Sequence, residues 1–340
     1  LDRLGAAPMA VYTDVTDEDL VAFLGDYDIG EVVSLKGIAE GVENTNYLLQ
    51  TLTSDAAAPQ NYILTLYEKR VRRDDLPYFL GLMDHLAENG ISCPTPIHGR
   101  DGAALRELAG RPAAIASFLS GMWPKKSTPK HCAELGASLA RMHDAGQSFD
   151  GSRANDMSVA GWQTLVAQTR DQADDVVPGL KDLLDAELSE ISSHWPDNLP
   201  NGVIHADLFP DNVFFLGDRL SGFIDFYFAC NDALAYDLAI CINAWCFEAD
   251  NSLNVTKARA LLRGYASVRP LTRQEFDALP QQARGSALRF LLTRLYDWVN
   301  HDPAAFVQPK DPKQFLGRLR FHQQVDGPGA YGVSFEDVSA

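Results

Sequence analysis

A short segment between two apolar runs carries several side chains that can do chemistry. Within VIHADLFPDNVFF, residues 203–215, these are His205, Asp207 and Asn212. Asp225 follows further along, in the apolar run GFIDF. Carboxylate and amide oxygens suit hard cations, and Mg²⁺ usually takes one or two such protein ligands together with substrate phosphate oxygens. The segment therefore predicts a site where a metal-bound phosphate meets a carboxylate base.

The residues after this segment show how its side chains would be positioned. NVFFLGDRLSGFIDF has an apolar run, a Gly-Asp turn and a second apolar run, which is typical of a β-hairpin. Asn212 begins the first strand and Asp225 ends the second, so antiparallel pairing returns both to one end, close to Asp207. The alternatives are a polar loop whose Asp and Asn only cap turns, and a His/Asp metallohydrolase. The second alternative lacks a further histidine cluster at ligand spacing.

This spacing resembles the catalytic loop of protein-kinase-like small-molecule kinases, in which His-x-Asp-x₄-Asn is followed by a hydrophobic residue and Asp. Other segments resemble parts of the aminoglycoside phosphotransferase superfamily: the nucleotide loop (GVENTNYLLQT), the interlobe hinge (FLSG), a helix that ends in His (LGASLARMH) and the helix behind the catalytic loop (DALAYDLA). Within that superfamily, the chain most resembles bacterial homoserine kinases of the phosphotransferase-like type in YILTLYEKR, HADLFPDN and FIDFYFACNDALAYDLAICINAWCF.

The resemblance implies an ATP-dependent kinase that phosphorylates the side-chain hydroxyl of L-homoserine, a step in threonine biosynthesis, with Mg²⁺ as cofactor. It implies that Asp207 orients the hydroxyl and takes its proton, and that Asn212 and Asp225 hold the metal. His205 would stabilise the loop. An aminoglycoside, choline or methylthioribose is an alternative acceptor. A second class of alternative is a non-catalytic nucleotide-binding pseudokinase.

Two polar residues lie on apolar helix faces. Asp237 shares its face with Leu238 and Cys241, so its carboxylate must be paired or hydrogen-bonded. In the family the matching Asp holds the backbone of the catalytic loop, and an ordinary buried cap or salt bridge is the alternative. His143 lies on an apolar face with Leu139, and we expect it to support the structure rather than to react.

The residues that would contact the nucleotide follow the family less closely. Kinase-like proteins use a lysine on the third strand, but YILTLYEKR places Thr65 there. Lys36, Lys69 and Arg70 are rival candidates for gripping phosphates, with a simple surface role as the alternative. The resemblance implies the following nucleotide-binding set: Gly41, Asn44, Thr65, Lys69, Phe118 and Ser120.

A homoserine acceptor carries a carboxylate and an ammonium beside its hydroxyl. Its pocket would need a cationic clamp and an acidic or carbonyl partner. Arg289 and Arg294, in SALRFLLTRLYDW, are the candidates for the clamp, and two surface arginines are the alternative. Tyr227, Asp232 and Trp298 are further candidates for the walls of the pocket.

The pattern of apolar residues divides the chain into two lobes. Runs rich in β-branched and aromatic residues predict an antiparallel meander with one main helix over 74–90 and a later hairpin. Beyond the Gly, Pro and Lys of SFLSGMWPKKSTP, helical periodicity dominates, over 129–146, 158–173, 179–194, 233–248, 255–267 and 273–300. With the resemblance, this indicates an α+β, bilobal protein-kinase-like fold. We expect an N-terminal nucleotide-binding lobe over 9–119 and a mostly α-helical catalytic and acceptor-binding lobe over 120–325.

Composition and charge narrow the classes of ligand. Hydrophobic residues make up 46% of the 340 residues, as in a globular protein with a sizeable core. The 29 Lys and Arg against 46 Asp and Glu give a formal net charge of −17, which disfavours nonspecific binding to nucleic acid or anionic membrane. The charge therefore argues against nucleic-acid and membrane partners, and the resemblance implies a small-molecule substrate. The sequence leaves the oligomeric state open.

The cysteines and the start of the chain bear on localisation. The five cysteines are odd in number and lack paired zinc-type spacing, so we expect reduced core thiols. No uninterrupted apolar stretch reaches the ~18 residues of a membrane span, and no signal-peptide pattern opens the sequence. These features predict a cytoplasmic protein. Residues 1–8, LDRLGAAP, precede Met9 and are expected to be vector-derived or upstream sequence.

Overall fold

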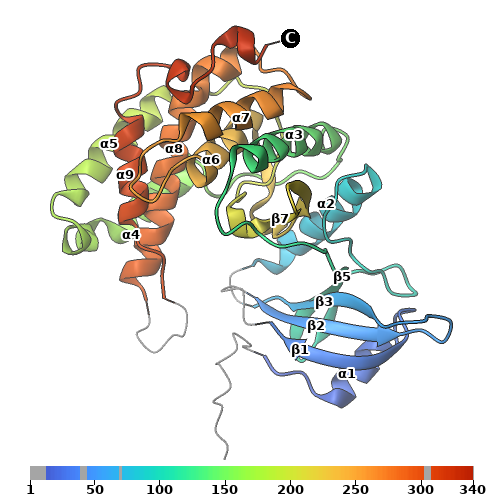
Figure 1. Cartoon of the computed structure of the whole chain (residues 1–340). Helices are drawn as coiled ribbons and strands as arrows, with labels where there is room; N and C mark the ends of the chain where they lie inside the picture. The colour runs from blue at the N-terminus through green and yellow to red at the C-terminus, as the bar shows by residue number, and fades with distance from the viewer. Residues whose placement is uncertain (1–12, 39–43, 69–70, 302–307, 340) are drawn as a thin grey trace, which may run out of the picture. The chain divides into compact units, whose positions relative to one another are not determined.

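The computed structural model describes residues 13–38, 44–68, 71–301 and 308–339 (Figure 1). The expected vector residues 1–8 lie outside these ranges, and so do three residues expected near the phosphates: Gly41, Lys69 and Arg70. The chain divides into two compact units, Leu1–Leu119 and Ser120–Ala340. In the described ranges, no helix combines the length and the apolar character needed to cross a membrane. All five cysteines are buried and free, as expected for core thiols.

The first unit is built on one antiparallel sheet. Its strands have the order β1-β2-β3-β5-β4. The bounds are β1 Glu31–Gly37, β2 Thr45–Leu52, β3 Gln60–Leu66, β4 Arg106–Leu108 and β5 Arg111–Ser117. Ala109 and Gly110 connect β4 to β5 with φ angles of 50° and 73°. Two successive positive φ values are what a tight two-residue hairpin needs.

Helices flank this sheet. The helix α1 (Asp17–Leu24) begins after Thr16, whose side chain accepts a hydrogen bond from the Asp19 N–H, so one free N-terminal donor is satisfied. Its apolar face belongs to the same core cluster as the inward side chains of β2 and β3, such as Leu49 and Leu64. A 3₁₀ turn, η1 (Arg73–Asp75), leads into α2 (Leu76–Glu88), the expected main helix.

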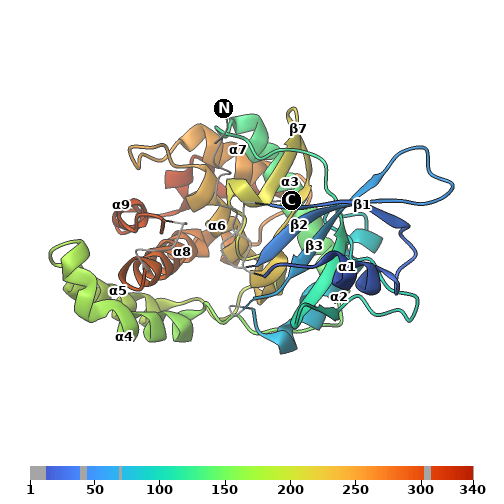
Figure 2. The ribbon, with the colours of Figure 1, turned by 90° about the horizontal axis from the view of Figure 1, so that it is seen from below.

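The second unit is mostly helical (Figures 1 and 2). Its helices are α3 Pro129–Gly146, α4 Val159–Val176, α5 Leu180–His194, α6 Leu234–Trp245, α7 Val255–Ala266, α8 Arg273–Val299 and α9 Lys313–His322. The first six match the expected helical segments, whereas α9 was not expected. Both views show α9 lying beside α8, and Phe315 and Leu319 of α9 join the core of this unit. The short turns η4 (Pro328–Tyr331) and η5 (Phe335–Asp337) carry the unit beyond residue 325.

Two short antiparallel pairs interrupt these helices and hold the polar segment. The strand β6 (Asn201–Ile204) pairs with β9 (Cys230–Ala233), and β7 (Val213–Leu216) pairs with β8 (Arg219–Phe223). The 3₁₀ turns η2 (Pro210–Asn212) and η3 (Phe226–Phe228) fill the loops between them. An antiparallel first unit and a helical second unit confirm the expected α+β class.

Candidate active site

The hairpin of β7 and β8 brings Asn212 and Asp225 to one end. The N–H of Ile224 donates to the Asn212 carbonyl at 3.0 Å, and Val213 is paired with Phe223. Asp225 lies directly after Ile224 in a left-handed conformation, with φ 65° and ψ 64°. This conformation is uncommon for a residue other than glycine and is often found at functional sites.

Asp207 lies in contact with Asn212. The Nδ2 of Asn212 donates to the Asp207 carbonyl at 2.9 Å and to its Oδ2 at 3.1 Å. The amide therefore fixes the Asp207 carboxylate, while the amide Oδ1 remains as an oxygen donor. The structure thus places Asp207 and Asn212 together and Asp225 at the same end of the hairpin.

The surroundings of Asp207 make its negative charge unfavourable. Burial raises the pKa of Asp207 to about 8. The charge of Arg289 opposes this rise, whereas the carboxylates of Asp225 and Asp211 add to it. The loop therefore concentrates negative charge that a cation would neutralise.

Asp237 anchors the backbone of the loop. Its two carboxylate oxygens accept hydrogen bonds from the N–H groups of His205, at 2.8 Å, and Ala206, at 3.0 Å. Ala206 has a φ of 64°, so the anchor holds a backbone turn that an L-residue rarely adopts. The Nε2 of His143 lies 3.2 Å from Asp237, and its Nδ1 lies 2.8 Å from the Tyr265 hydroxyl.

The same contacts keep the buried Asp237 ionised. Burial acts to raise the pKa of Asp237, but the hydrogen bond and charge of His143 outweigh it. The contacts with His205 lower the pKa further, so it lies below its usual value. A carboxylate that accepts two backbone donors can therefore remain charged in the interior.

His205 has its Nε2 3.0 Å from the Ile224 carbonyl, which ties the loop to the residue between β8 and Asp225. Its Nδ1 has no hydrogen-bond partner within the described part of the chain. Burial lowers the pKa of His205, so the ring is neutral near pH 7. A neutral, enclosed ring with this contact fits the expected role of His205 in stabilising the loop, which stays a prediction.

The predicted acceptor residues fall into different environments. Arg289 is buried, and its Nη1 donates to the Ala206 carbonyl at 2.6 Å, so it contacts the loop from the interior. Asp232 accepts a hydrogen bond from Asn155 at 2.6 Å. Tyr227 is half-buried and Trp298 is exposed. Among the described residues, Arg294 is the one of these five that lines the cavity described next.

A cavity of about 610 Å³ lies beside the loop, within the second unit. Its described lining includes Phe209 and Asp211 from the loop, Arg294 from α8, and two cations that the sequence analysis missed, Lys310 and Arg318. A signal for the second cation was present. Phe315, Leu316, Leu319 and His322 follow helical spacing, and Arg318 adjoins that apolar face.

The predicted nucleotide-binding residues that the structure describes lie at or near the ends of strands. Asn44 is buried, and its Oδ1 accepts from the Glu68 N–H at 3.3 Å. The Thr65 hydroxyl donates to Asn46 Oδ1 at 2.8 Å, a contact between neighbouring strands. Phe118 and Ser120 are exposed. These contacts order the sheet, and a nucleotide-binding role for these residues stays a prediction.

Comparison with known proteins extends the resemblance over the whole chain. Residues 34–271 match the phosphotransferase enzyme family. The chain is 60% identical over 331 residues to a protein named homoserine kinase from Paramagnetospirillum magneticum, covering 96% of this chain and 100% of that protein. It is 62% identical over 325 residues to the homoserine kinase of Parvibaculum lavamentivorans, covering 96% and 99% of the two chains.

Solved structures support the fold at lower identity. An amicoumacin kinase in complex with AMP-PNP and Ca²⁺ superposes with a TM-score of 0.65 at 14% identity, covering 95% of this chain and 97% of that one. A choline kinase from Cryptosporidium parvum gives the same TM-score, 0.65, at 14% identity, with coverage of 91% and 95%. These similarities confirm the expected phosphotransferase fold.

Proposed function

The chain belongs to the phosphotransferase enzyme family, and from this premise we propose that it transfers the γ-phosphoryl group of ATP to the side-chain hydroxyl of L-homoserine. The choice of L-homoserine as the acceptor rests on the sequence identity of about 60% to proteins named homoserine kinase, over nearly the full length of both chains. The products would be O-phospho-L-homoserine and ADP, so the reaction would be a step in threonine biosynthesis. We also propose that the protein acts in the cytoplasm.

Asp207 would act on the acceptor. Its carboxylate, fixed by the Asn212 amide, accepts the hydrogen bond of the hydroxyl and takes its proton as the oxygen attacks the γ-phosphorus. The bond between the γ-phosphorus and the oxygen bridging to the β-phosphate breaks, and ADP leaves. The positive charge of Mg²⁺ beside Asp207 would oppose the rise in its pKa and favour the ionised form that accepts the proton.

Asn212 and Asp225 would hold Mg²⁺. They supply one amide oxygen and one carboxylate from one end of a hairpin, a donor set that fits a hard cation. The negative charge of Asp211 and Asp225, which adds to the rise in the Asp207 pKa, also favours a cation here. When bound, Mg²⁺ would supply charge neutralisation for the transferred phosphate. The protein residues supply position, because Asp237 holds the backbone from which Asp207 and Asn212 extend.

The two units would divide the work. We assign nucleotide binding to residues 9–119 and catalysis and acceptor binding to residues 120–325. The residue that grips the phosphates in place of the strand lysine stays open between Lys36, Lys69 and Arg70. Of these three residues, Lys36 lies in the described part of the chain, where it is exposed on β1.

A coupled assay of ADP formation tests the proposal. L-homoserine should give a kcat/KM well above the values for L-serine, choline and an aminoglycoside, and excess chelator should abolish turnover. Asp207→Asn should lower kcat by roughly 10²–10⁴ with nucleotide binding retained. Asp225→Ala should lose turnover while keeping the fold. Turnover with another alcohol but not with homoserine would overturn the acceptor, and full activity of Asp207→Asn would overturn the mechanism.

A further inference from the structure

The cavity beside the loop is lined by two arginines, and one of them, Arg318, has few partners for its charge. Arg318 of α9 is 5% exposed, and its Nε and Nη1 have no hydrogen-bond partner among the residues that the structure describes. Arg294 of α8 donates through Nη1 to the Gln314 side chain at 2.7 Å, which is a neutral partner. The two guanidinium groups therefore share one cavity wall without a carboxylate bonded to either one in the described ranges.

Such an arrangement is costly for the protein alone. Burial lowers the pKa of Arg318 to about 10, and the charge of Arg294 adds to this effect. The ring of Phe315 lies 4.5 Å from each guanidinium, and cation–π contact recovers part of the cost. It supplies no acceptor for the N–H groups, which a buried guanidinium normally has.

The remaining charged residues of the cavity suit a zwitterionic ligand, which carries both a carboxylate and an ammonium. Asp211 and Asp311 also line it, and Asp211 lies 3.3 Å from Lys310. The cavity thus holds Arg318, which has no carboxylate hydrogen-bonded to it among the described residues, and Arg294, on which the charges of Asp211 and Asp311 act. The charges of two lining residues, Lys310 and Arg294, interact with Asp207, so the cavity lies within electrostatic reach of the proposed base.

We propose that Arg318, together with Arg294, binds the α-carboxylate of the phosphoryl acceptor. The inference rests on the proposed function and adds Arg318 as a specificity residue for an amino-acid alcohol over a plain amino alcohol. The carboxylate accepts hydrogen bonds from the two guanidinium groups where they line the cavity. Charged hydrogen bonds of this kind are stronger than neutral ones and give geometric selectivity.

Arg318→Met provides the test, because methionine keeps an unbranched apolar stem against Phe315 and removes the charge. Arg320→Met, on an exposed position of the same helix, is the matched control. Each variant is assayed with L-homoserine and with 3-aminopropan-1-ol, which keeps the hydroxyl and the ammonium but lacks the carboxylate. The ratio of the two kcat/KM values measures the preference for the carboxylate.

Arg318→Met should lower kcat/KM for homoserine about 10- to 100-fold, mainly through KM, and leave 3-aminopropan-1-ol within about twofold. The Arg318→Lys variant should recover part of the preference, and Arg320→Met should keep all of it. Thermal stabilisation by homoserine should disappear in Arg318→Met, which gives a readout independent of turnover.

The outcomes separate the two levels of the argument. If the parent chain turns over homoserine and Arg318→Met keeps its preference ratio, or loses both acceptors equally, the carboxylate assignment is overturned and the proposed function stands. If the parent chain gives no turnover with homoserine, the proposed function and the assignment that rests on it both fall. Thermal unfolding of each variant confirms that the comparison is made between folded proteins.

Discussion

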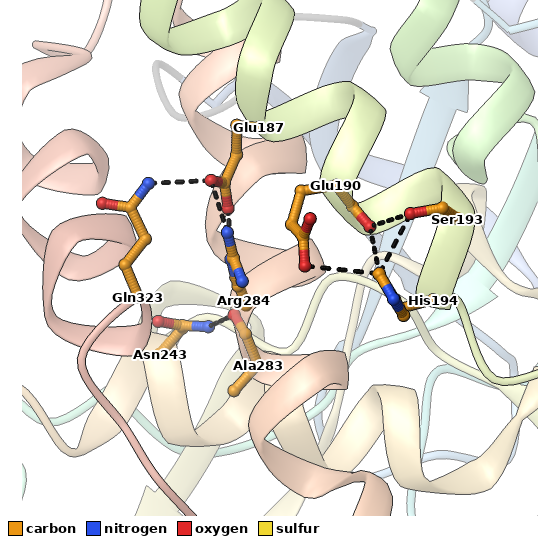
Figure 3. A network of polar contacts seen from close by, with 8 residues as sticks. All are labelled: Glu187, Glu190, Ser193, His194, Asn243, Ala283, Arg284 and Gln323. Carbon is orange, nitrogen blue, oxygen red and sulfur yellow. Dashed lines mark hydrogen bonds and ion pairs between the residues drawn. The ribbon is translucent and has the colours of Figure 1, made fainter.

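Two arginines of the helical unit lie in buried surroundings but differ in their partners. One is hydrogen-bonded to a carboxylate, and the other is not. Arg284 of α8 donates through Nε and Nη2 to the Glu187 carboxylate at 2.5 and 2.8 Å, and Gln323 donates to the same carboxylate at 2.7 Å (Figure 3). Arg318 of α9 stacks on aromatic rings and leaves two nitrogens without a partner in the described chain. The pKa of Arg284 is raised, chiefly by its hydrogen bond to Glu187, whereas burial lowers that of Arg318.

The difference distinguishes an arginine whose charge is neutralised within the fold from an arginine whose charge a ligand can neutralise. The pair of Glu187 and Arg284 joins α5 to α8, and Gln323 adds the end of α9, so both charges are completed within the fold. A buried charge that the fold does not complete costs free energy, because desolvation is not compensated. Arg318 is in that situation, and a ligand carboxylate in the cavity would compensate its charge.

The largest effect should come from breaking the completed pair. Glu187→Gln removes the negative charge and leaves Arg284 partly buried and unpaired, so we expect the free energy of unfolding to fall by about 3–5 kcal/mol. Urea denaturation measures it. Glu190→Gln is the control on the same helix, because Glu190 is exposed and paired only with His194 at 3.3 Å among the described residues, and it should cost at most about 1 kcal/mol. An equal fall in the free energy of unfolding for both variants would contradict the structural role of the pair.

How much of this the sequence predicts depends on how far apart the contacting residues lie along the chain. Asp207, Asn212 and Asp225 belong to one local hairpin, and turn chemistry with strand pairing was enough to bring them together. Arg318 depends on packing against Phe247, which is distant in sequence, and on a helix of ten residues with few flanking signals. Periodicity can place a residue on an apolar face, but it cannot show whether the tertiary fold supplies a partner.

The next largest effect is expected from adding a carboxylate of the protein's own to the cavity. Gln314→Glu places a carboxylate where the Gln314 oxygen accepts from Arg294, so the cavity would resemble the Glu187 pair. We expect the KM for L-homoserine to rise about tenfold, because the new carboxylate competes with the substrate for the guanidinium groups. Steady-state kinetics measures the change. Gln308→Glu adds the same charge at an exposed position and should change KM little, so an equal rise in both variants would point to a general charge effect.

A smaller effect is expected on the stability of Arg318→Met. Removing a charge that the fold leaves uncompensated relieves desolvation, while the lost cation–π contacts act in the opposite direction. The free energy of unfolding should therefore stay constant or rise by up to about 1 kcal/mol. This is opposite in sign to Glu187→Gln. If the free energy of unfolding in urea fell by several kcal/mol, the charge of Arg318 would be compensated within the fold.

The smallest effect concerns His322, which both arginines influence. Its Nε2 lies 3.0 Å from Asn243 Oδ1 and its Nδ1 lies 3.0 Å from the Tyr331 hydroxyl. Burial, with smaller contributions from the charges of Arg318 and then Arg284, lowers the pKa of His322 to about 3. The unfolded chain, with an ordinary histidine pKa of about 6.5, binds a proton that the folded chain excludes. This contribution to stability is therefore present above pH ~6.5 and is lost as the pH falls toward 3, by at most about 1.4 kcal/mol per pH unit.

Arg318→Met should raise the pKa of His322 by less than about one unit, because burial is the larger cause and remains. The acid limb of the stability curve should then flatten at a higher pH than in the parent chain. Titration of the ring by NMR measures the pKa, and His322→Gln, which should lose this limb, identifies the proton in urea denaturation at several pH values. An unchanged or lower pKa in Arg318→Met would mean that the charge of Arg318 does not reach His322, and the two arginine regions would then be electrostatically independent.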